Sequence, residues 1–299
     1  MKEKIVVTIV TPTYNRLSTL PRLLESLCHQ TNNSFQWVII DDGSTDDTEK
    51  FFDDLKKQEV PFEWEYHRKQ NGGKHTALNA CHTYIRGEVV LILDSDDYLT
   101  FDAVETIQSE WKNYKNRNDL CGMSYFKGYK DGNHLSIANE QDDYIDNDIH
   151  YRVNKRIKGD RCEIVRTDLL KMYPFPVHAG EKFFSESWLW NIIALNYKTV
   201  YRNKTIYICE YLEGGLTKSG RALRMKNPLG MMDNCRTYFN KKVCLREQTK
   251  EMLLYWVYAR CAGYSFLKTL KTSGVTLGMI LTSLPGNALY LYWKKKYLE

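Results

Sequence analysis

The stretch that decides the fold runs from Glu88 to Leu99 and reads Glu88-Val89-Val90-Leu91-Ile92-Leu93-Asp94-Ser95-Asp96-Asp97-Tyr98-Leu99. Its first half is a run of apolar residues, which is typical of a strand buried on both faces of a parallel sheet. Its second half places three carboxylates within four residues, at the end of the strand where open α/β sheets bind ligands. Neighbouring acids repel one another unless a positive charge lies among them. The stretch therefore predicts a bound divalent cation, with a solvated acidic turn as the alternative.

The residues before this stretch alternate between expected strands and expected helices. Strands are indicated at residues 5–10, 35–40 and 62–66, and each is followed by a segment with helical periodicity or helix-capping residues. With residues 88–93 as the fourth strand, this alternation predicts an α/β fold with a parallel, doubly wound sheet.

Beyond about residue 120 the regular alternation is lost. The elements expected there are strands at 121–126, 162–165 and near 205–208, a polar loop at 130–150, and a buried helix at 188–195. A loop over residues 211–217, followed by basic residues, is expected either to close over a ligand or to be solvated.

Composition indicates an ordinary globular protein. The 299 residues are 43% hydrophobic and 26% charged, with a net charge of +5, and they contain no nucleic-acid-binding motif. Eight cysteines are scattered without a CxxC pair, which favours free thiols in a reducing compartment over a zinc site or a disulfide framework. Since no signal peptide opens the sequence, we expect a cytosolic protein without a nucleic-acid partner.

The last fifty residues differ in character from the rest. Residues 272–293 carry no charge and are followed by Lys294-Lys295-Lys296. Glycines and Pro285 interrupt this segment, so we expect two short helices lying in the membrane interface. Packing against protein and a true membrane span are the alternatives. The interpretation predicts peripheral contact with the inner face of the cell membrane through residues 251–299.

Polar side chains follow three of the expected strands. Parallel strands deliver them to one edge of the sheet, together with the loop Gly72-Gly73-Lys74. A carboxylate pair, a DxD sequence and a glycine-rich loop at one edge predict a nucleoside diphosphate site. Asp42 would accept a hydrogen bond from a base imide, and Lys74 would meet phosphate oxygens. Asp96, helped by Asp94, would hold Mn²⁺ or Mg²⁺. A turn with a helix cap is the alternative for Asp42.

The order of these motifs closely resembles the family 2 glycosyltransferases of the GT-A fold, of the small bacterial membrane-associated type. The matching residues are Val10-Thr11-Pro12-Thr13-Tyr14-Asn15, Val38-Ile39-Ile40-Asp41-Asp42-Gly43-Ser44-Thr45-Asp46, Asn71-Gly72-Gly73, and Leu93-Asp94-Ser95-Asp96-Asp97. The resemblance implies a nucleotide-sugar donor, a divalent metal on the DxD sequence, and inversion at the anomeric carbon. Carried over by motif, Thr11, Tyr14 and Asp42 would contact the nucleoside. Asp94 and Ser95 would contact donor sugar or ribose, and Asp96 the metal.

The catalytic base is the part of the resemblance that departs from the common pattern. Many family members have a Glu-Asp pair before an apolar helix, whereas this chain has Glu186-Ser187 before Trp188. Glu186 is the expected base, which would take the proton of the acceptor hydroxyl. Glu181 is its competitor, and a plain helix cap is the alternative role of Glu186. His178 could be a late metal ligand or a surface residue.

These features together predict a GT-A catalytic domain over residues 1–215 with a C-terminal loop and helical region over 216–299. The donor-binding half would be residues 1–100, and the acceptor-side half residues 101–215. We expect a cytoplasmic, metal-dependent, inverting glycosyltransferase at the inner membrane face. It would move a sugar, most simply from a UDP-sugar, to a glycan or lipid-linked acceptor in surface polysaccharide synthesis. A sugar-nucleotide pyrophosphorylase and a catalytically silent nucleotide-binding protein are the alternatives.

Overall fold

The computed structural model describes residues 5–137, 141–209 and 216–299. The chain forms two compact units, and each is described by itself. The sheet unit takes the described residues of Met1–Asn147, Ile157–Phe175 and Asn196–Leu212, and the helical unit takes those of Asp148–Arg156, Pro176–Leu195 and Glu213–Glu299. The boundary expected at residue 215 lies outside the described residues. The division into a catalytic domain and a C-terminal region therefore stays a prediction.

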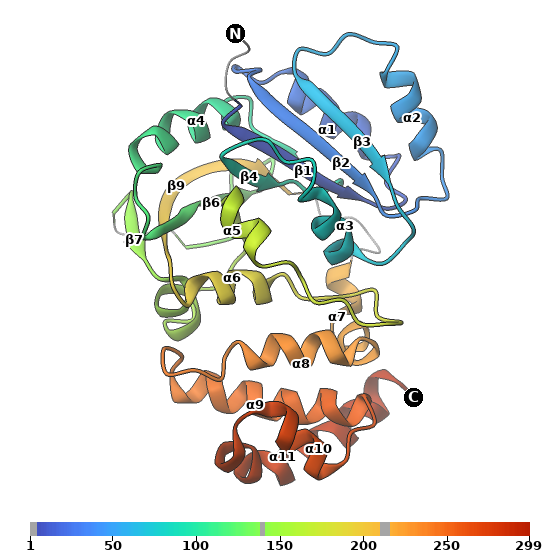
Figure 1. The fold of residues 1–299 in the computed structure, drawn as a ribbon, viewed down its shortest axis with the longest axis vertical. Helices are drawn as coiled ribbons and strands as arrows, with labels where there is room; N and C mark the ends of the chain where they lie inside the picture. The colour runs from blue at the N-terminus through green and yellow to red at the C-terminus, as the bar shows by residue number, and fades with distance from the viewer. Residues whose placement is uncertain (1–4, 138–140, 210–215) are drawn as a thin grey trace. The chain divides into compact units, whose positions relative to one another are not determined.

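The sheet unit is built on nine strands (Figure 1). They are β1 (Val7–Thr13), β2 (Phe35–Asp41), β3 (Glu63–Arg68), β4 (Val89–Ile92), β5 (Tyr98–Leu99), β6 (Leu120–Gly128), β7 (Tyr144–Asp146), β8 (Arg161–Arg166) and β9 (Lys198–Ile208). Their order is β3-β2-β1-β4-β8-β6-β9-β5, with β7 paired to β9. The four strands β3, β2, β1 and β4 are parallel, as the sequence predicts.

The second half of the sheet is mixed, because β8 runs antiparallel to both β4 and β6. The strands expected at 121–126, 162–165 and near 205–208 are confirmed as parts of β6, β8 and β9. The segment 130–150 differs from the predicted polar loop: it contains β7 and leads into the short helix η1 (Ile149–Asn154). Ile145 of β7 packs against the sheet core and Ile149 of η1 is buried, and these two apolar side chains within an otherwise polar segment are the reason.

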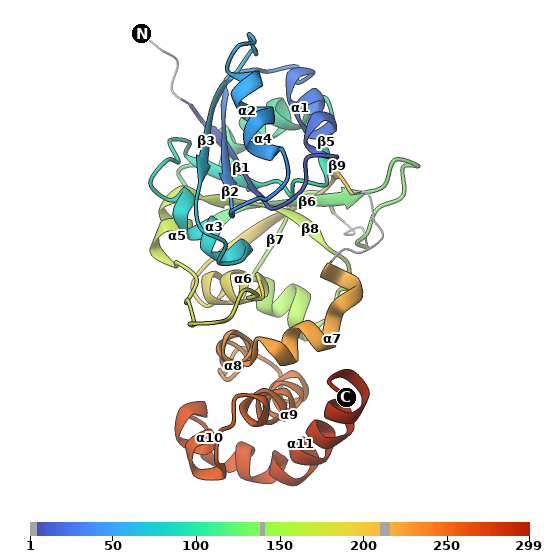
Figure 2. The ribbon, with the colours of Figure 1, turned by 90° about the vertical axis from the view of Figure 1, so that its right-hand side faces the viewer.

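Helices cover both faces of the sheet (Figure 2). One face carries α1 (Leu20–Cys28), α2 (Thr48–Leu55) and α4 (Ala103–Tyr114), and the other carries α3 (Lys74–Cys81) and α5 (Thr167–Met172). Leu23 and Phe52 pack in one core with Ile9 and Trp37 of the strands. Since alternate strand residues point to opposite faces, strands covered on both sides bury every residue of β1 and β2, polar ones included. The buried Thr8 hydroxyl donates to the Gln36 side-chain oxygen at 2.9 Å.

The helical unit contains η1, α6 (Ser187–Ala194), α7 (Leu216–Lys226), α8 (Pro228–Arg236), α9 (Leu245–Cys261), α10 (Phe266–Ser273) and α11 (Thr276–Tyr297). Helix α9 lies between α8 and α11 (Figures 1 and 2). Its residues Tyr255–Ala259 are buried, so the first part of the segment 251–299 is protein core. None of the helices in the described part of the chain is both long and apolar enough to cross a bilayer.

The two short helices expected over 272–293 are wrong in detail, because a single helix, α11, continues through Pro285. Gly278 and Gly286 do not end it. They allow close packing on α9: a Cβ on Gly286 would lie 2.6 Å from Trp256, and one on Gly278 would lie 2.6 Å from Met252. Pro285 is exposed, on the side where water can satisfy the carbonyl that a proline leaves without its helical partner.

Candidate active site

The loops that follow β1 and β2 are joined by hydrogen bonds through Asn15. The Asn15 N–H donates to the Ser44 hydroxyl at 3.0 Å, and the Asn15 side-chain oxygen accepts from the Thr45 N–H at 2.7 Å. Asn15 has a φ of 51°, a left-handed conformation that asparagine tolerates better than most residues. The junction leaves the neighbouring Tyr14 side chain 44% exposed at the carboxyl end of β1.

The two threonines of β1 lie inside the fold. Thr11 is fully buried, and its hydroxyl accepts a hydrogen bond from the Trp37 indole N–H at 2.9 Å. Thr13 is also buried, and its hydroxyl has no hydrogen-bond partner among the residues that the structure describes. The motif predicts a nucleoside contact for Thr11 and none for Thr13, because the pattern alone cannot tell which hydroxyl the core satisfies.

Asp42, at the end of β2, is surrounded by the glycine-rich loop. Its carboxylate accepts from the Lys69 ammonium at 2.6 Å and from the N–H groups of Gly72 and Gly73 at 2.9 and 2.6 Å. Gly73 has a φ of 93°, which a residue with a side chain rarely adopts. A carboxylate offers about four acceptor positions, and these contacts occupy three of them.

Helix α1 holds the backbone of the acidic stretch. The Thr19 hydroxyl donates to the carbonyl of Ser95 at 2.7 Å, and the Arg22 guanidinium donates to the carbonyl of Asp96 at 2.6 Å. Arg16 lies 3.5 Å from the Asp96 carboxylate. Thr19 and Arg22 therefore fix the main chain of the acidic loop, and the Arg16 guanidinium faces the carboxylate of Asp96.

Tyr207 of β9 holds the same stretch from the other side. Its hydroxyl donates to the Asp97 carboxylate at 2.8 Å and accepts from the Asp94 N–H at 3.0 Å. Burial, with the nearby charge of Asp94, raises the pKa of Asp97 to about 6. Tyr207 lies 110 residues from Asp97 in the chain, so no local pattern predicts this contact.

Two lysines face Asp94. Lys74, the first residue of α3, forms an ion pair with it. Lys127 of β6 is partly buried, with its ammonium 4.2 Å from the centre of the Tyr207 ring. Burial opposes the charged form of Asp94, but the charges of Lys74 and Lys127 outweigh it and lower the pKa of this carboxyl. Lys127 was missed, although a lone lysine after the apolar run of β6 was a signal for it.

The carboxylates of the acidic stretch differ in how well they fit a divalent cation. Within the described residues no group of three or more His, Cys, Asp or Glu side chains could hold a metal ion by itself. Asp96 nevertheless fits a shared site, because its side chain is 28% exposed and its ion pair with Arg16 is long. Mg²⁺ is usually bound by one or two carboxylates together with substrate phosphates and water, and such a site needs no third protein ligand.

The two candidate bases belong to the helical unit and have different surroundings. Glu181 caps α8: its carboxylate oxygens accept from the N–H groups of Leu229 and Gly230 at 2.7 and 2.8 Å. Glu186 is the N-cap residue of α6, but its side chain makes no capping hydrogen bond. The structure thus gives a helix-capping role to Glu181 and does not give one to Glu186.

His178 and the expected loop over 211–217 complete the list of candidates. The His178 ring nitrogen Nε2 lies 2.7 Å from the carboxylate of Asp233, which is also 3.5 Å from Arg236, so His178 takes part in a local network of the helical unit. Residues 211–215 of the loop lie outside the described residues.

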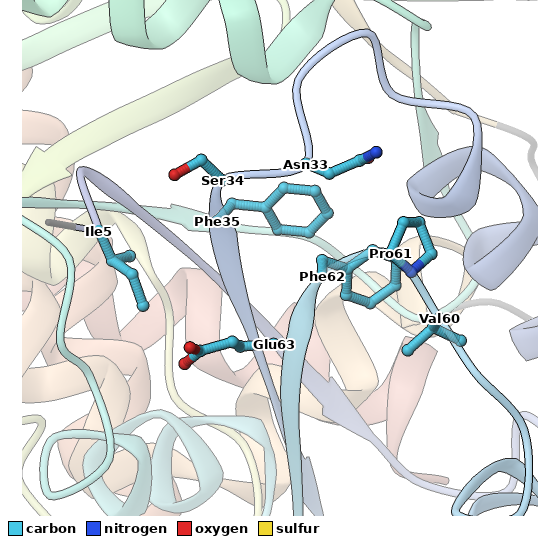
Figure 3. Close-up of a pocket in the computed structure, with 8 residues that line it drawn as sticks. All are labelled: Ile5, Asn33, Ser34, Phe35, Val60, Pro61, Phe62 and Glu63. Carbon is cyan, nitrogen blue, oxygen red and sulfur yellow. The ribbon is translucent and has the colours of Figure 1, made fainter. Parts of the chain in front are cut away.

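A surface hollow occurs at the opposite edge of the sheet, at the amino ends of β1, β2 and β3 (Figure 3). It is lined by Ile5, Asn33, Ser34, Phe35, Val60, Pro61, Phe62 and Glu63. The rings of Phe35 and Phe62 stack there with centroids 4.7 Å apart, and Glu63 is paired with Arg86 at 2.7 Å. None of the described residues that line the hollow is a cation, so the hollow does not match the diphosphate site that the sequence predicts.

Comparison with solved structures confirms the expected GT-A fold. Staphylococcus aureus TarS, residues 1–349 in complex with UDP-GlcNAc, matches with a TM-score of 0.58 and 19% identity, over 94% of this chain and 79% of that one. The mannosyltransferase PcManGT of Pyrobaculum calidifontis, in complex with GDP-Man and Mn²⁺, matches with a TM-score of 0.57 and 17% identity, over 97% and 81% of the two chains.

Comparison of sequences gives the family. Glycosyltransferase GlyG of Streptococcus pneumoniae serotype 4 is 23% identical over 249 residues, which are 80% of this chain and 79% of GlyG. The model of glycosyl transferase family 2 matches residues 8–173, a range that contains the candidate donor-site residues and ends before Glu186. These matches favour a transferase over the pyrophosphorylase and over the silent binding protein. The chain belongs to glycosyl transferase family 2.

Proposed function

We propose that the carboxyl edge of β1, β2 and β4 binds a UDP-sugar, and that the enzyme transfers its sugar to a hydroxyl of a glycan or lipid-linked acceptor. The observation that carries the proposal is the convergence of Asp42, Lys74, Asp94 and Asp96 at that edge, through the contacts given above. The complexes of TarS with UDP-GlcNAc and of PcManGT with GDP-Man support a nucleotide-sugar donor.

Each part of the donor has a matching group in the sheet unit. Tyr14 presents an exposed ring on which a base can stack, and Asp42 has an acceptor position for the base imide. Thr11 supports this surface from the core through Trp37. Lys74 contacts the diphosphate, and we propose that Lys127 contacts the diphosphate as well.

The sugar-proximal part of the donor meets the acidic stretch. Asp94 and Ser95 contact the ribose or the sugar, and Asp96 with Asp94 holds Mn²⁺ or Mg²⁺ against the diphosphate. When bound, the cation offsets the charge that develops on the leaving diphosphate. Arg16 faces the same carboxylate, and Thr19 and Arg22 keep its main chain in place.

The transfer step needs a base on the acceptor side. Glu186 accepts the proton of the acceptor hydroxyl as that oxygen forms a bond to the anomeric carbon. The bond from this carbon to the diphosphate oxygen breaks, and the nucleoside diphosphate leaves with the electron pair. Because attack and departure occur on opposite faces of the carbon, the product has the inverted configuration.

The place of action is part of the same proposal. The enzyme works at the cytoplasmic face of the cell membrane in surface polysaccharide synthesis, and contacts that membrane through the segment 251–299. The uncharged run of residues 272–293 and the lysines that follow it support this location.

Release of UDP from a panel of UDP-sugars, with acceptor glycans and Mn²⁺, tests the proposed chemistry. Glu186→Gln should lower the transfer rate about 10²–10⁴-fold, because it removes the base. Glu181→Gln is the matched control, since an amide oxygen can still accept a hydrogen bond at α8. Full transfer by Glu186→Gln, or equal loss in both variants, would reject Glu186 as the base. Failure of every nucleotide sugar to release its diphosphate would reject the function.

A further inference from the structure

Helix α11 exposes an apolar stripe. Its exposed apolar side chains lie at positions i, i+3, i+4, i+7, i+14 and i+15: Leu277, Ile280, Leu281, Leu284, Leu291 and Tyr292. This spacing places them on one side of an α-helix. A helix on a protein surface ordinarily turns charged residues outward, and this stripe has none before Lys294.

The opposite side of α11 packs against other helices of the helical unit. Met279 and Trp293 are buried, and the Trp256 indole N–H of α9 donates to the Met279 carbonyl at 2.9 Å. Near the end of the helix, Arg221 of α7 lies over the Trp293 ring at 4.8 Å and donates to the Tyr297 hydroxyl at 2.7 Å. The helical unit is therefore held together without using the stripe.

Lysines lie at both ends of the exposed surface. Lys294, Lys295 and Lys296 occupy the last turn of α11, and the neighbouring helix α10 exposes Lys268 and Lys271 beside Phe266 and Leu267. Residues 252–298 contain no acid at all. The terminal Glu299 is 3.3 Å from Lys294 and offsets one of these charges. The surface is thus apolar along its length and cationic at its ends.

We propose that the stripe of α11 and these lysines form one docking surface for an anionic lipid membrane, which we call the α11 face. Leucines enter the boundary between head groups and acyl chains while lysines meet lipid phosphates, the pattern of a helix lying in the plane of a membrane. A symmetric pair of these faces would instead bring like charges together, without an acid in residues 252–298 to offset them. Charge thus favours lipid over a second copy.

The inference makes the membrane contact of the proposed function specific, and it can fail separately from the chemistry. Lipid binding is measured on the full chain with neither donor nor acceptor. UDP release is measured without lipid, and should be the same in the wild type and in the variants of the α11 face.

Flotation with lipid vesicles tests the proposal. The wild type should float with phosphatidylcholine vesicles that contain phosphatidylglycerol, and far less with pure phosphatidylcholine. Leu281→Asp with Leu284→Asp should lower partitioning at least about tenfold, because two leucines are lost and two acids are added. These side chains are 72% and 84% exposed, so the fold should persist, with an unchanged circular dichroism spectrum.

Two further variants separate the contributions. Replacing Lys294, Lys295 and Lys296 by Gln should weaken binding to the anionic vesicles by about fivefold per lysine and leave the weak binding to neutral vesicles unchanged. Leu245→Asp is the matched control: Leu245 is 75% exposed on α9, next to Cys244, whose N–H donates to Asn154. It should float as the wild type does.

Three results would overturn the inference. They are a wild type that floats with neither vesicle, a Leu281→Asp and Leu284→Asp variant that floats undiminished, and a Leu245→Asp variant that loses binding equally. A wild type that binds no vesicle and forms a dimer by light scattering, which the double variant breaks, would assign the α11 face to a second copy.

Discussion

The parallel strands β1, β2 and β3 have a hollow at their amino ends and a polar network at their carboxyl ends. The hollow is lined mainly by apolar side chains such as Phe35 and Phe62 (Figure 3). At the other end, the polar groups bind one another: Asp42 holds the N–H of Gly73, and Asp94 holds Lys74. The hollow therefore has the shape of a binding site, but its mainly apolar lining does not supply the groups that bind a diphosphate. The network has the groups that a diphosphate and a cation need, and these can exchange partners when a ligand arrives.

The largest expected effect comes from removing the central carboxylate of the network. Asp96→Ala should lower kcat/KM of transfer about 10²–10³-fold, because the charge of the leaving group is no longer offset. In calorimetry, Mn²⁺ should no longer raise the affinity for UDP. Glu63→Ala at the hollow is the matched loss of one carboxylate, and should leave both measurements unchanged. Full transfer by Asp96→Ala would show that transfer does not depend on a metal held by Asp96.

Lys127 allows a sharper test, because its role was not evident from motifs. Lys127→Met keeps most of the volume of the side chain and removes the charge, and should weaken UDP binding about 10–100-fold. Uridine has no phosphate, so its affinity should stay the same. Calorimetry with both ligands measures the difference. Equal weakening of uridine and UDP would indicate that the substitution only disturbs the fold.

A smaller effect is expected from Tyr207. Tyr207→Phe keeps the ring near Lys127 and removes the hydroxyl that joins Asp97 to the Asp94 N–H. We expect kcat at saturating donor to fall about five- to tenfold, with a loss of about 1 kcal/mol in the free energy of unfolding. Steady-state kinetics and urea denaturation give the two values. An unchanged kcat with lowered stability would make Tyr207 purely structural.

The smallest effect on transfer is expected at the hollow. Phe62→Leu removes one ring of the stack with Phe35, so the free energy of unfolding should fall by about 1–2 kcal/mol. The rate of transfer and the affinity for UDP should not change. If a folded Phe62→Leu protein lost UDP binding, the hollow would be part of the donor site, and the contrast between the two edges would fail.

The sequence predicted which end of the strands carries the candidate site, but it predicted only some of the side chains that make contacts there. Strand β4 and the acids after it are adjacent in the chain, so a local pattern was enough to place Asp94 and Asp96. Tyr207 and Lys127 reach the same acids from β9 and β6, and no local pattern records which distant side chain completes a contact.

In the helical unit, too, contacts between residues far apart in the sequence could not be predicted. The sequence favours Glu186 as the base and leaves Glu181 as its competitor, whereas the hydrogen bonds of Glu181 to Leu229 and Gly230 give Glu181 a helix-capping role that no local pattern records. Gly286 likewise predicts a helix end when seen alone, whereas its packing on Trp256 keeps α11 continuous. In both cases a tertiary contact outweighs the local preference.

Hydrogen–deuterium exchange on addition of UDP and Mn²⁺ compares the two edges in one measurement. We expect slower exchange in peptides that cover residues 41–46, 69–76 and 93–99, at the carboxyl edge. Peptides that cover residues 33–36 and 60–63, at the hollow, should exchange as before. Protection at the hollow, or protection at neither edge with UDP and Mn²⁺ in excess, would show that the carboxyl edge is not the donor site.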